Sequence, residues 1–245
     1  MSFVDELEKN DVFDEGESRM TEIIDFEGAI KDKLRKDNNS YTGHDEDPED
    51  NVFHASWMGY CKRQVYLSKT GLKYHDDKTL GIFRAGSRVH SFMEDEVFEE
   101  LPRHLVFEKP IRPLEIDGVK FVGTADCIDM ENGVIYDFKS RGGWYRFNPP
   151  TQRHLDQLHI YMKATGIHEA QVVYISKKDF EVRTWPEDGT FEFDEERFQE
   201  LVEKAKTVMD LIEEHGVAES EDELDDIVEK CDSFICKKEG LVFDE

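Results

Sequence analysis

Two aspartates and a lysine stand on either side of a sequence that favours a tight β-hairpin. Asn132 and Gly133 separate two apolar stretches, and this dipeptide is typical of a two-residue hairpin turn. With that turn, Asp126 pairs directly with Lys139 and lies diagonally from Asp137. Because side chains alternate along a strand, all three share one face of the sheet. Two carboxylates at this separation can bind one divalent cation through their oxygen atoms.

The face that carries these charges is predicted to be at least partly buried. With the same register, Ile128, Met130 and Ile135 lie on it. Carboxylates without partners are costly to bury, whereas a bound cation offsets that cost. The alternative is an ordinary cross-strand ion pair between Asp126 and Lys139 on a solvated face.

Two further pairs of polar residues have the spacing of neighbours on a helix surface. His90 and Glu94 are four residues apart, as are Gln157 and Tyr161, and such pairs lie on one helix face. Taken singly, a histidine among apolar residues is more often a hydrogen-bonded core residue, and Gln157 and Tyr161 are common half-buried types. Their joint occurrence around the hairpin favours a functional site.

In their order along the chain, these residues resemble the motifs of a known group of nucleases. The segments are Gly86-Ser-Arg-Val-His90-Ser-Phe-Met-Glu94, Gly123-Thr-Ala-Asp126, Asp137-Phe-Lys139 and Gln157-Leu-His-Ile-Tyr161. They are similar to the G-x-x-x-H-x-x-x-E, G-x-x-D, D-x-K and Q-x-x-x-Y motifs of the RecB-type branch of the PD-(D/E)XK nuclease superfamily. Each motif alone is weak, but four in the family's order are a specific match.

The resemblance implies a restriction-endonuclease-like core and a role for each matching residue. A divalent cation, Mg²⁺ or Mn²⁺, would be bound by His90, Asp126, Asp137 and the backbone carbonyl of Phe138. Lys139 would orient or activate the attacking water. Gln157 and Tyr161 would contact the DNA backbone or brace the site, and Glu94 would support His90.

Three windows of this acidic chain contain neither Asp nor Glu, namely His54 to His75, Lys78 to Met93 and Phe138 to Leu155. They contain several basic residues, so an anionic partner would be guided to them, although local variation in composition is the alternative. We expect DNA phosphates to contact Arg84, Arg88, Arg141, Arg146 and Arg153, and bases to stack on Trp144 and Tyr145.

The chain has four cysteines, at positions 61, 127, 231 and 236. Within the RecB-type branch, a CRISPR-associated exonuclease family has one cysteine before the histidine motif and three near the C-terminus, which together hold an iron–sulfur cluster. Cys61, Cys231 and Cys236 match three of those positions, and a [4Fe-4S] cluster would lack its fourth cysteine ligand. His54, His75 or Asp232 could substitute, and zinc or simple buried thiols are the alternatives.

Composition bounds the remaining interpretations. The 245 residues contain 57 Asp and Glu against 31 Lys and Arg, which gives a formal charge of −26. A hydrophobic fraction of 38% excludes wholesale disorder, and no apolar run is long enough to span a membrane. We therefore expect a cytoplasmic protein without membrane contact. The acidity favours a salt-adapted host, and mimicry of nucleic acid is the alternative.

The pattern of elements predicts a mixed α/β fold, with a central sheet flanked by helices. Helices are expected at about 56–68, 80–101, 151–165, 194–215 and 221–230, with strands at 105–107, 119–129, 134–139, 171–175 and 180–185. Residues 1–50 end in an acidic run and are expected to be a partly disordered segment. Residues 51–245 form the expected nuclease domain, with its C-terminal helices and cysteine pair.

These features together predict a metal-dependent deoxyribonuclease that hydrolyses phosphodiester bonds, as an exonuclease on DNA ends or on single strands. A helicase or an integrase is a candidate partner. The alternative from another class is a catalytically silent module on the same scaffold, which binds DNA or a protein. A third reading is an enzyme that hydrolyses RNA.

Overall fold

The computed structural model describes residues 25–41, 51–101, 104–232, 236, 240–241 and 243. Internal contacts separate Met1–Lys33 from a larger unit, Leu34–Glu245. Most of the expected acidic segment, residues 1–24 and 42–50, lies outside the described residues, so its boundary stays a prediction. Within it, Phe26–Tyr41 forms a helix, α2.

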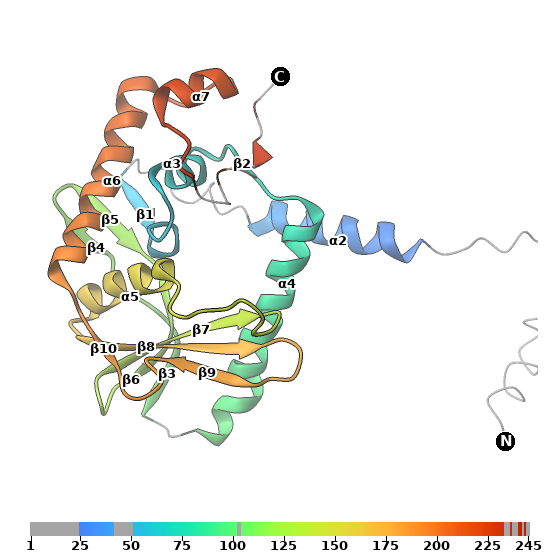
Figure 1. Ribbon diagram of the computed structural model, residues 1–245, viewed down its shortest axis with the longest axis vertical. Coiled ribbons are helices and arrows are strands. Elements are labelled where there is room, and N and C mark those ends of the chain that lie inside the picture. Colours follow the sequence, from blue (N-terminus) through green and yellow to red (C-terminus); the bar gives the residue numbers. More distant parts are fainter. Residues whose placement is uncertain are drawn as a thin grey trace, which may run out of the picture. The chain divides into compact units, whose positions relative to one another are not determined.

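A six-stranded mixed sheet lies at one end of the larger unit (Figure 1). Its strands run in the order β10 (Phe191–Glu192), β8 (Glu169–Ser176), β7 (Val134–Arg141), β6 (Thr124–Asp129) and β3 (Leu105–Pro110), and β9 (Val182–Trp185) also pairs with β8. The β7 and β8 strands are parallel, whereas the other pairs are antiparallel. The predicted mixed α/β class is therefore confirmed.

Two smaller sheets join segments that are distant in sequence. In one, β1 (Val52–His54), β5 (Val119–Val122) and β4 (Leu114–Ile116) pair in the order β1-β5-β4. In the other, β11 (Gly240–Leu241) pairs with β2 (Lys73–Tyr74), so the C-terminal end of the chain returns to the strand that follows α3 (Lys62–Thr70).

The helices begin and end largely where the sequence signals predict. In α4 (Asp77–Phe92), the Asp76 side chain accepts a hydrogen bond from the Thr79 amide, and the helix continues as a π-helical turn, Met93–Val97, and a 3-10 turn, Phe98–Glu100. The other helices are α5 (Gln152–Thr165), α6 (Glu195–His215) and α7 (Glu221–Ile227). The helix expected from residue 56 is instead a 3-10 turn, Ala55–Trp57, and α3 begins only after Cys61.

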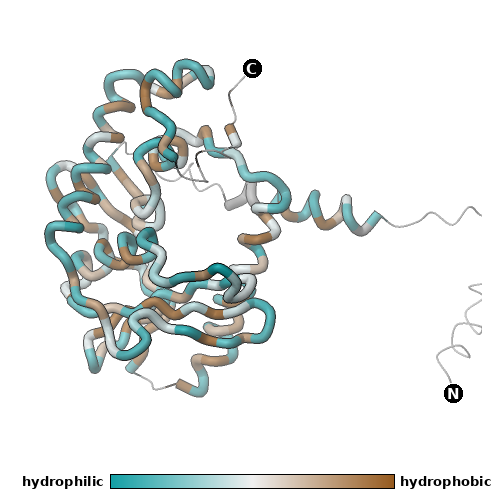
Figure 2. The backbone as a smooth tube through the Cα atoms, viewed as in Figure 1, coloured by the Kyte–Doolittle hydropathy of each residue, from teal (hydrophilic) through white to brown (hydrophobic). Residues whose placement is uncertain are grey.

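The sheet is packed between α4 and α5. Val89 of α4 belongs to a buried cluster with Phe138 and Cys127 on one face of the sheet, whereas Leu158 of α5 belongs to the main core with Ile135 and other strand residues. Figure 2 shows hydrophobic and hydrophilic stretches alternating along α6, as expected for a helix with one buried side. Among the described residues, no helix is long and apolar enough to cross a membrane.

The register of the β6–β7 hairpin differs from the prediction by two residues. Ile128 pairs with Ile135 and Cys127 with Tyr136, so the loop has four residues, 130–133, rather than two. The Asp129 carboxylate causes the difference, because it accepts hydrogen bonds from the backbone of Glu131 and Asn132 and from the Asn132 side chain. Gly133 closes the loop at φ +68°, a conformation that favours glycine.

Because side chains alternate with a period of two, a shift of two residues leaves each β7 side chain on the face of the sheet that was predicted. Continuing the register places Asp126 opposite Asp137, not opposite Lys139 as predicted. Met130 falls in the loop and is 64% exposed, so its expected place on the buried face is wrong.

Candidate active site

A cavity of about 640 Å³ opens where α4 crosses the end of β7. Its lining includes His90 with the acidic residues Glu94, Glu108 and Asp126. It also includes four basic residues, Lys139, Arg141, Arg153 and Lys177. Two of the three acid-free windows, on α4 and from β7 to α5, supply much of the lining. The first window, His54 to His75, does not line this cavity.

Asp126 lies where the ladder between β6 and β7 ends. Its Oδ2 accepts a hydrogen bond from the amide of Phe138 at 2.6 Å. Its Oδ1 lies 3.8 Å from Nδ1 of His90, which reaches the strand from the last turn of α4. Ligand atoms of His90, Asp126 and Glu108 all lie within 4.8 Å of one another. One imidazole and two carboxylates at this separation suit a small divalent cation.

Asp137 and Lys139 form a buried ion pair beside Asp126. Nζ of Lys139 donates to Oδ1 of Asp137 at 2.7 Å, and the Asp137 residue is 1% exposed. Burial raises the pKa of Asp137 to about 7, Asp126 adds to the rise, and Lys139 opposes it. Burial acts to lower the pKa of Lys139, but Asp137 and Asp126 outweigh it, so the pKa is raised and Lys139 is an ammonium at neutral pH.

The second oxygen of Asp137 supports a cation in this region. Oδ2 is buried and accepts no hydrogen bond within the part of the chain that the structure describes. A buried carboxylate oxygen without a donor is costly, and a divalent cation removes that cost. The side chains predicted as metal ligands, those of His90, Asp126 and Asp137, therefore have the chemistry to bind a divalent cation. Asp137 is not among the three residues whose ligand atoms cluster within 4.8 Å.

Two glycines of the motifs allow close approach between elements. A Cβ on Gly123 would lie 2.9 Å from Cε1 of Tyr161, and a Cβ on Gly86 would lie 3.1 Å from Oγ of Ser140. Gly123 thus lets the β5–β6 connection pack directly on the α5 tyrosine, and Gly86 lets α4 approach β7.

Gln157 and Tyr161 are both buried, and Nε2 of Gln157 donates to Oη of Tyr161 at 2.8 Å. Neither residue lines the cavity. Of the two roles predicted for this pair, the geometry therefore suits bracing rather than contact with DNA.

The arginines predicted to bind DNA do not all meet at the cavity. Arg141 and Arg153 line it, whereas Arg84 and Arg88 are exposed on α4 and do not. Arg84 lies 3.7 Å from the carboxylate of Asp37. Arg146 is exposed and its guanidinium lies over the ring of Tyr145.

The two aromatic residues predicted to stack on bases differ in exposure. Tyr145 is 84% exposed. Trp144 packs against the core, with the guanidinium of Arg183 4.5 Å from the centre of its ring. Tyr145 is therefore the more accessible of the two.

The charged or titratable residues of the cavity that sequence reasoning missed include Glu108, His154 and Lys177. Burial, with Lys139 and two arginines, lowers the pKa of His154 to about 2, so the ring is neutral. Since Arg153 can only donate, Nε2 of His154 accepts its hydrogen bond and the proton resides on Nδ1, facing Oη of Tyr174. His154 therefore positions Arg153. Its place directly after Arg153 in an acid-free window was the available signal.

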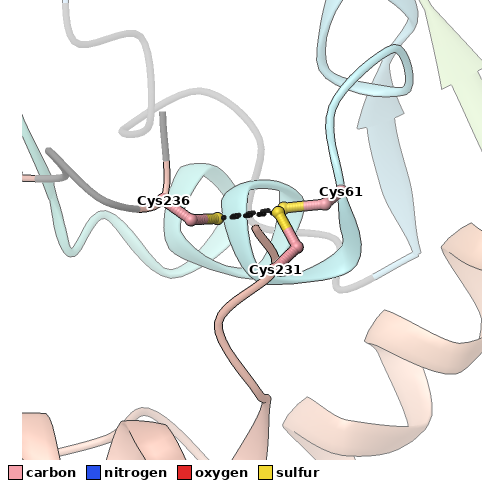
Figure 3. Close-up of side chains that lie close together, drawn as sticks. All are labelled: Cys61, Cys231 and Cys236. Atoms are coloured by element: carbon pink, nitrogen blue, oxygen red, sulfur yellow. Dashed lines mark hydrogen bonds between the residues drawn. The ribbon is translucent and has the colours of Figure 1, made fainter. Parts of the chain in front are cut away.

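Cys61, Cys231 and Cys236 lie together although 170 residues separate the first two. Figure 3 shows their sulfur atoms pointing toward one another, and Sγ of Cys236 lies 3.3 Å from each of the other two. Burial raises the pKa of Cys61 to about 12, so this thiol stays protonated unless a metal replaces its proton. The fourth cysteine, Cys127, packs with Val89 and Phe138 instead.

Residues 73–237 match the sequence model of the PD-(D/E)XK nuclease superfamily. The match covers more than half of the chain, and the protein belongs to this superfamily. No curated protein sequence matches significantly. The narrower resemblance to the CRISPR-associated exonucleases stays a prediction.

Solved structures resemble this chain at low sequence identity. The crystal structure of SSO0001 has a TM-score of 0.52 and 18% identity, and the match covers 76% of this chain and 87% of that one. The alkaline exonuclease LHK-Exo from Laribacter hongkongensis has a TM-score of 0.49 and 13% identity, over 67% of this chain and 89% of that one. LHK-Exo in complex with dAMP has a TM-score of 0.48 and 14% identity, with the same coverage.

Proposed function

We propose that this protein is a divalent-metal-dependent nuclease that hydrolyses phosphodiester bonds of DNA, at ends or in single strands. One observation carries the proposal. Asp126 and Lys139 open onto a single cavity, beside a buried Asp137 whose Oδ2 has no donor among the described residues. Membership of a nuclease superfamily supports the same chemistry.

The residues around the cavity divide the task. His90, Asp126, Asp137 and the Phe138 carbonyl would hold Mg²⁺ or Mn²⁺, which when bound neutralises phosphate charge and activates water. Lys139, as an ammonium bonded to Asp137, would orient the attacking water and stabilise negative charge that develops on the phosphate.

The arginines that line the cavity would bind the phosphates on either side of the scissile bond. Arg141 and Arg153 reach the cavity from β7 and from the first turn of α5, and His154 holds the Arg153 guanidinium in place. The ring of Tyr145 would stack on an exposed base. Arg84, Arg88 and Arg146 would contact more distant phosphates, and Trp144 would support this surface from the core.

Incubation with end-labelled DNA tests the proposal directly. Linear single strands, linear duplexes, circular single strands and RNA of the same sequence are incubated with Mn²⁺, Mg²⁺ or EDTA, at low and at molar salt. We expect cleavage of DNA with either metal, loss of cleavage in EDTA, and loss in Asp126→Asn. Absence of cleavage at every salt concentration would contradict the proposal, and gel-shift binding would then favour the catalytically silent module.

We also propose that Cys61, Cys231 and Cys236 bind one metal centre, with an iron–sulfur cluster as the assignment that the resemblance favours. The proximity of three sulfurs supports a centre. A cluster held by four cysteines does not fit, because Cys127 lies in another part of the core, so the fourth ligand would have to be a residue of another type.

Metal content decides among the outcomes for the cysteines. Protein purified without oxygen should be brown, absorb at about 400 nm and lose both colour and stability in Cys61→Ser. Cys127→Ser is the matched control and should keep the colour. Colourless protein with one zinc would replace the cluster by a zinc site. Protein with neither iron nor zinc would contradict the metal centre.

A further inference from the structure

We propose that Glu108 is an additional ligand of the divalent cation, together with His90 and Asp126. The inference rests on the proposed function, since it concerns the same cation. Sequence motifs gave no indication of it, because Glu108 lies on β3, outside every motif. Its carboxylate lines the active-site cavity and lies within 4.8 Å of the ligand atoms of both His90 and Asp126.

The pairing of β3 with β6 places two like charges opposite each other. Phe107 pairs with Cys127 and Lys109 with Ala125, so Glu108 and Asp126 occupy facing positions between them. Like charges directly across a pair of strands are destabilising. Among the described residues, no Lys or Arg forms an ion pair with Glu108, Asp126 or the nearby Glu94. A cation shared by Glu108 and Asp126 converts this repulsion into attraction.

The backbone of Glu108 is held in an uncommon conformation. Its φ is +44°, in the left-handed region, although it is not a glycine and lies inside a strand. Such a conformation is energetically costly for a residue with a side chain, and it persists where surrounding structure or function requires it. The residues on either side of Glu108, Phe107 and Lys109, pair regularly with β6.

Binding of Mn²⁺, measured by titration and by its electron paramagnetic resonance signal, tests the assignment without reference to cleavage. Mn²⁺ prefers oxygen ligands, so the three cysteine sulfurs contribute little to the signal. We expect Glu108→Gln to weaken Mn²⁺ binding by about tenfold or more. Glu115→Gln, which removes an exposed carboxylate from β4, is the matched control and should bind as the original protein does.

The outcomes separate this inference from the proposed function. One outcome is that the original protein cleaves DNA while Glu108→Gln binds Mn²⁺ as tightly as the original protein does. In that case Glu108 is not a ligand and the nuclease proposal stands. If the original protein neither binds Mn²⁺ nor cleaves DNA, both fail. Should Glu108→Gln melt at a lower temperature than the original protein, Glu108→Asn replaces it, because asparagine tolerates a positive φ. Unchanged Mn²⁺ affinity in that variant would equally overturn the assignment.

Discussion

Asp137 and Lys139 share a hydrogen bond in which Asp137 is buried and Lys139 is partly exposed to the cavity. Each depends on the other for its charge, because burial favours the neutral form of both and their mutual attraction opposes it. A change at one of these residues therefore alters the protonation of the other. Asp137 is proposed to bind the metal and Lys139 to stabilise developing charge. Measurements at different pH values are needed to tell these two roles apart.

Replacement of the lysine should separate these two roles. In Lys139→Ala, Asp137 loses its hydrogen-bonded cation, so its pKa rises further and Mn²⁺ binding weakens at pH 7. At pH 9 the carboxyl is ionised and Mn²⁺ binding should recover, whereas cleavage should stay about 10²–10⁴-fold low. Titration and cleavage assays at both pH values check this, with the exposed Lys178→Ala as control. Normal cleavage by Lys139→Ala at pH 9 would show that the lysine has no catalytic role.

Asp137 should also make stability depend on pH when no divalent cation is present. Its pKa is raised from 3.8 to about 7, so the folded protein holds this proton more tightly than the unfolded chain does. Its contribution to the free energy of unfolding therefore falls as the pH rises from about 4 to about 7. Melting temperatures over this range should fall less steeply in Asp137→Asn than in the original protein. The exposed Asp188→Asn should retain the original slope.

For individual residues, the sequence was sufficient to predict the members of the site that lie inside motifs, but it did not predict Glu108. Asp126, Asp137 and Lys139 were identifiable because a turn signal and strand alternation bring them together. Glu108 joins them through the register of β3 and a positive φ, and neither is encoded by a local pattern.

Contacts between elements explain why two glycines belong to the motifs. Gly86 and Gly123 sit where α4 meets β7 and where the β5–β6 connection meets α5. The helices and strands that carry the polar motif residues thus approach one another more closely than a side chain at either glycine would allow.

The hairpin register was predicted incorrectly because the Asp129 carboxylate, rather than the Asn132-Gly133 dipeptide alone, determines the loop.

A methyl group at one of these contacts should disturb the site from outside the cavity. In Gly123→Ala, the added Cβ would meet the Tyr161 ring at 2.9 Å, so either the ring or the strand must move. We expect a loss of about 1–3 kcal/mol in the free energy of unfolding, together with slower cleavage. Urea denaturation and DNA cleavage measure the two effects. Gly142→Ala meets nothing within 4 Å and should change neither; a neutral Gly123→Ala would show that the contact is not tight.

At the scale of the larger unit, a buried arginine joins its two ends. Arg63 of α3 is 1% exposed, and its guanidinium donates to the carbonyls of Val228 and Leu224 and pairs with Asp225. The pairing of β11 with β2 and the three neighbouring cysteines join the same regions. The helix α3 is therefore bound to the C-terminal segment by several independent contacts.

Removal of this guanidinium should destabilise the protein strongly. In Arg63→Met, two buried carbonyls lose their donor, and we expect a loss of about 2–4 kcal/mol in the free energy of unfolding. The adjacent, exposed Lys62→Met should change it by less than about 0.5 kcal/mol. Urea denaturation of both variants, with metal content held equal, provides the comparison. If Arg63→Met and Lys62→Met had equal free energies of unfolding, the buried arginine would not hold the C-terminal segment in place.

The same arginine has a consequence for the order in which the protein can fold during synthesis. Its carbonyl partners lie 161 and 165 residues further along the chain. At about 5–20 residues per second, the ribosome makes them roughly 8–30 s after Arg63 itself. Until then the guanidinium must remain hydrated, so α3 cannot settle into its final position. The nascent chain therefore cannot secure the helix that precedes the histidine motif until Leu224 and Val228 have been made.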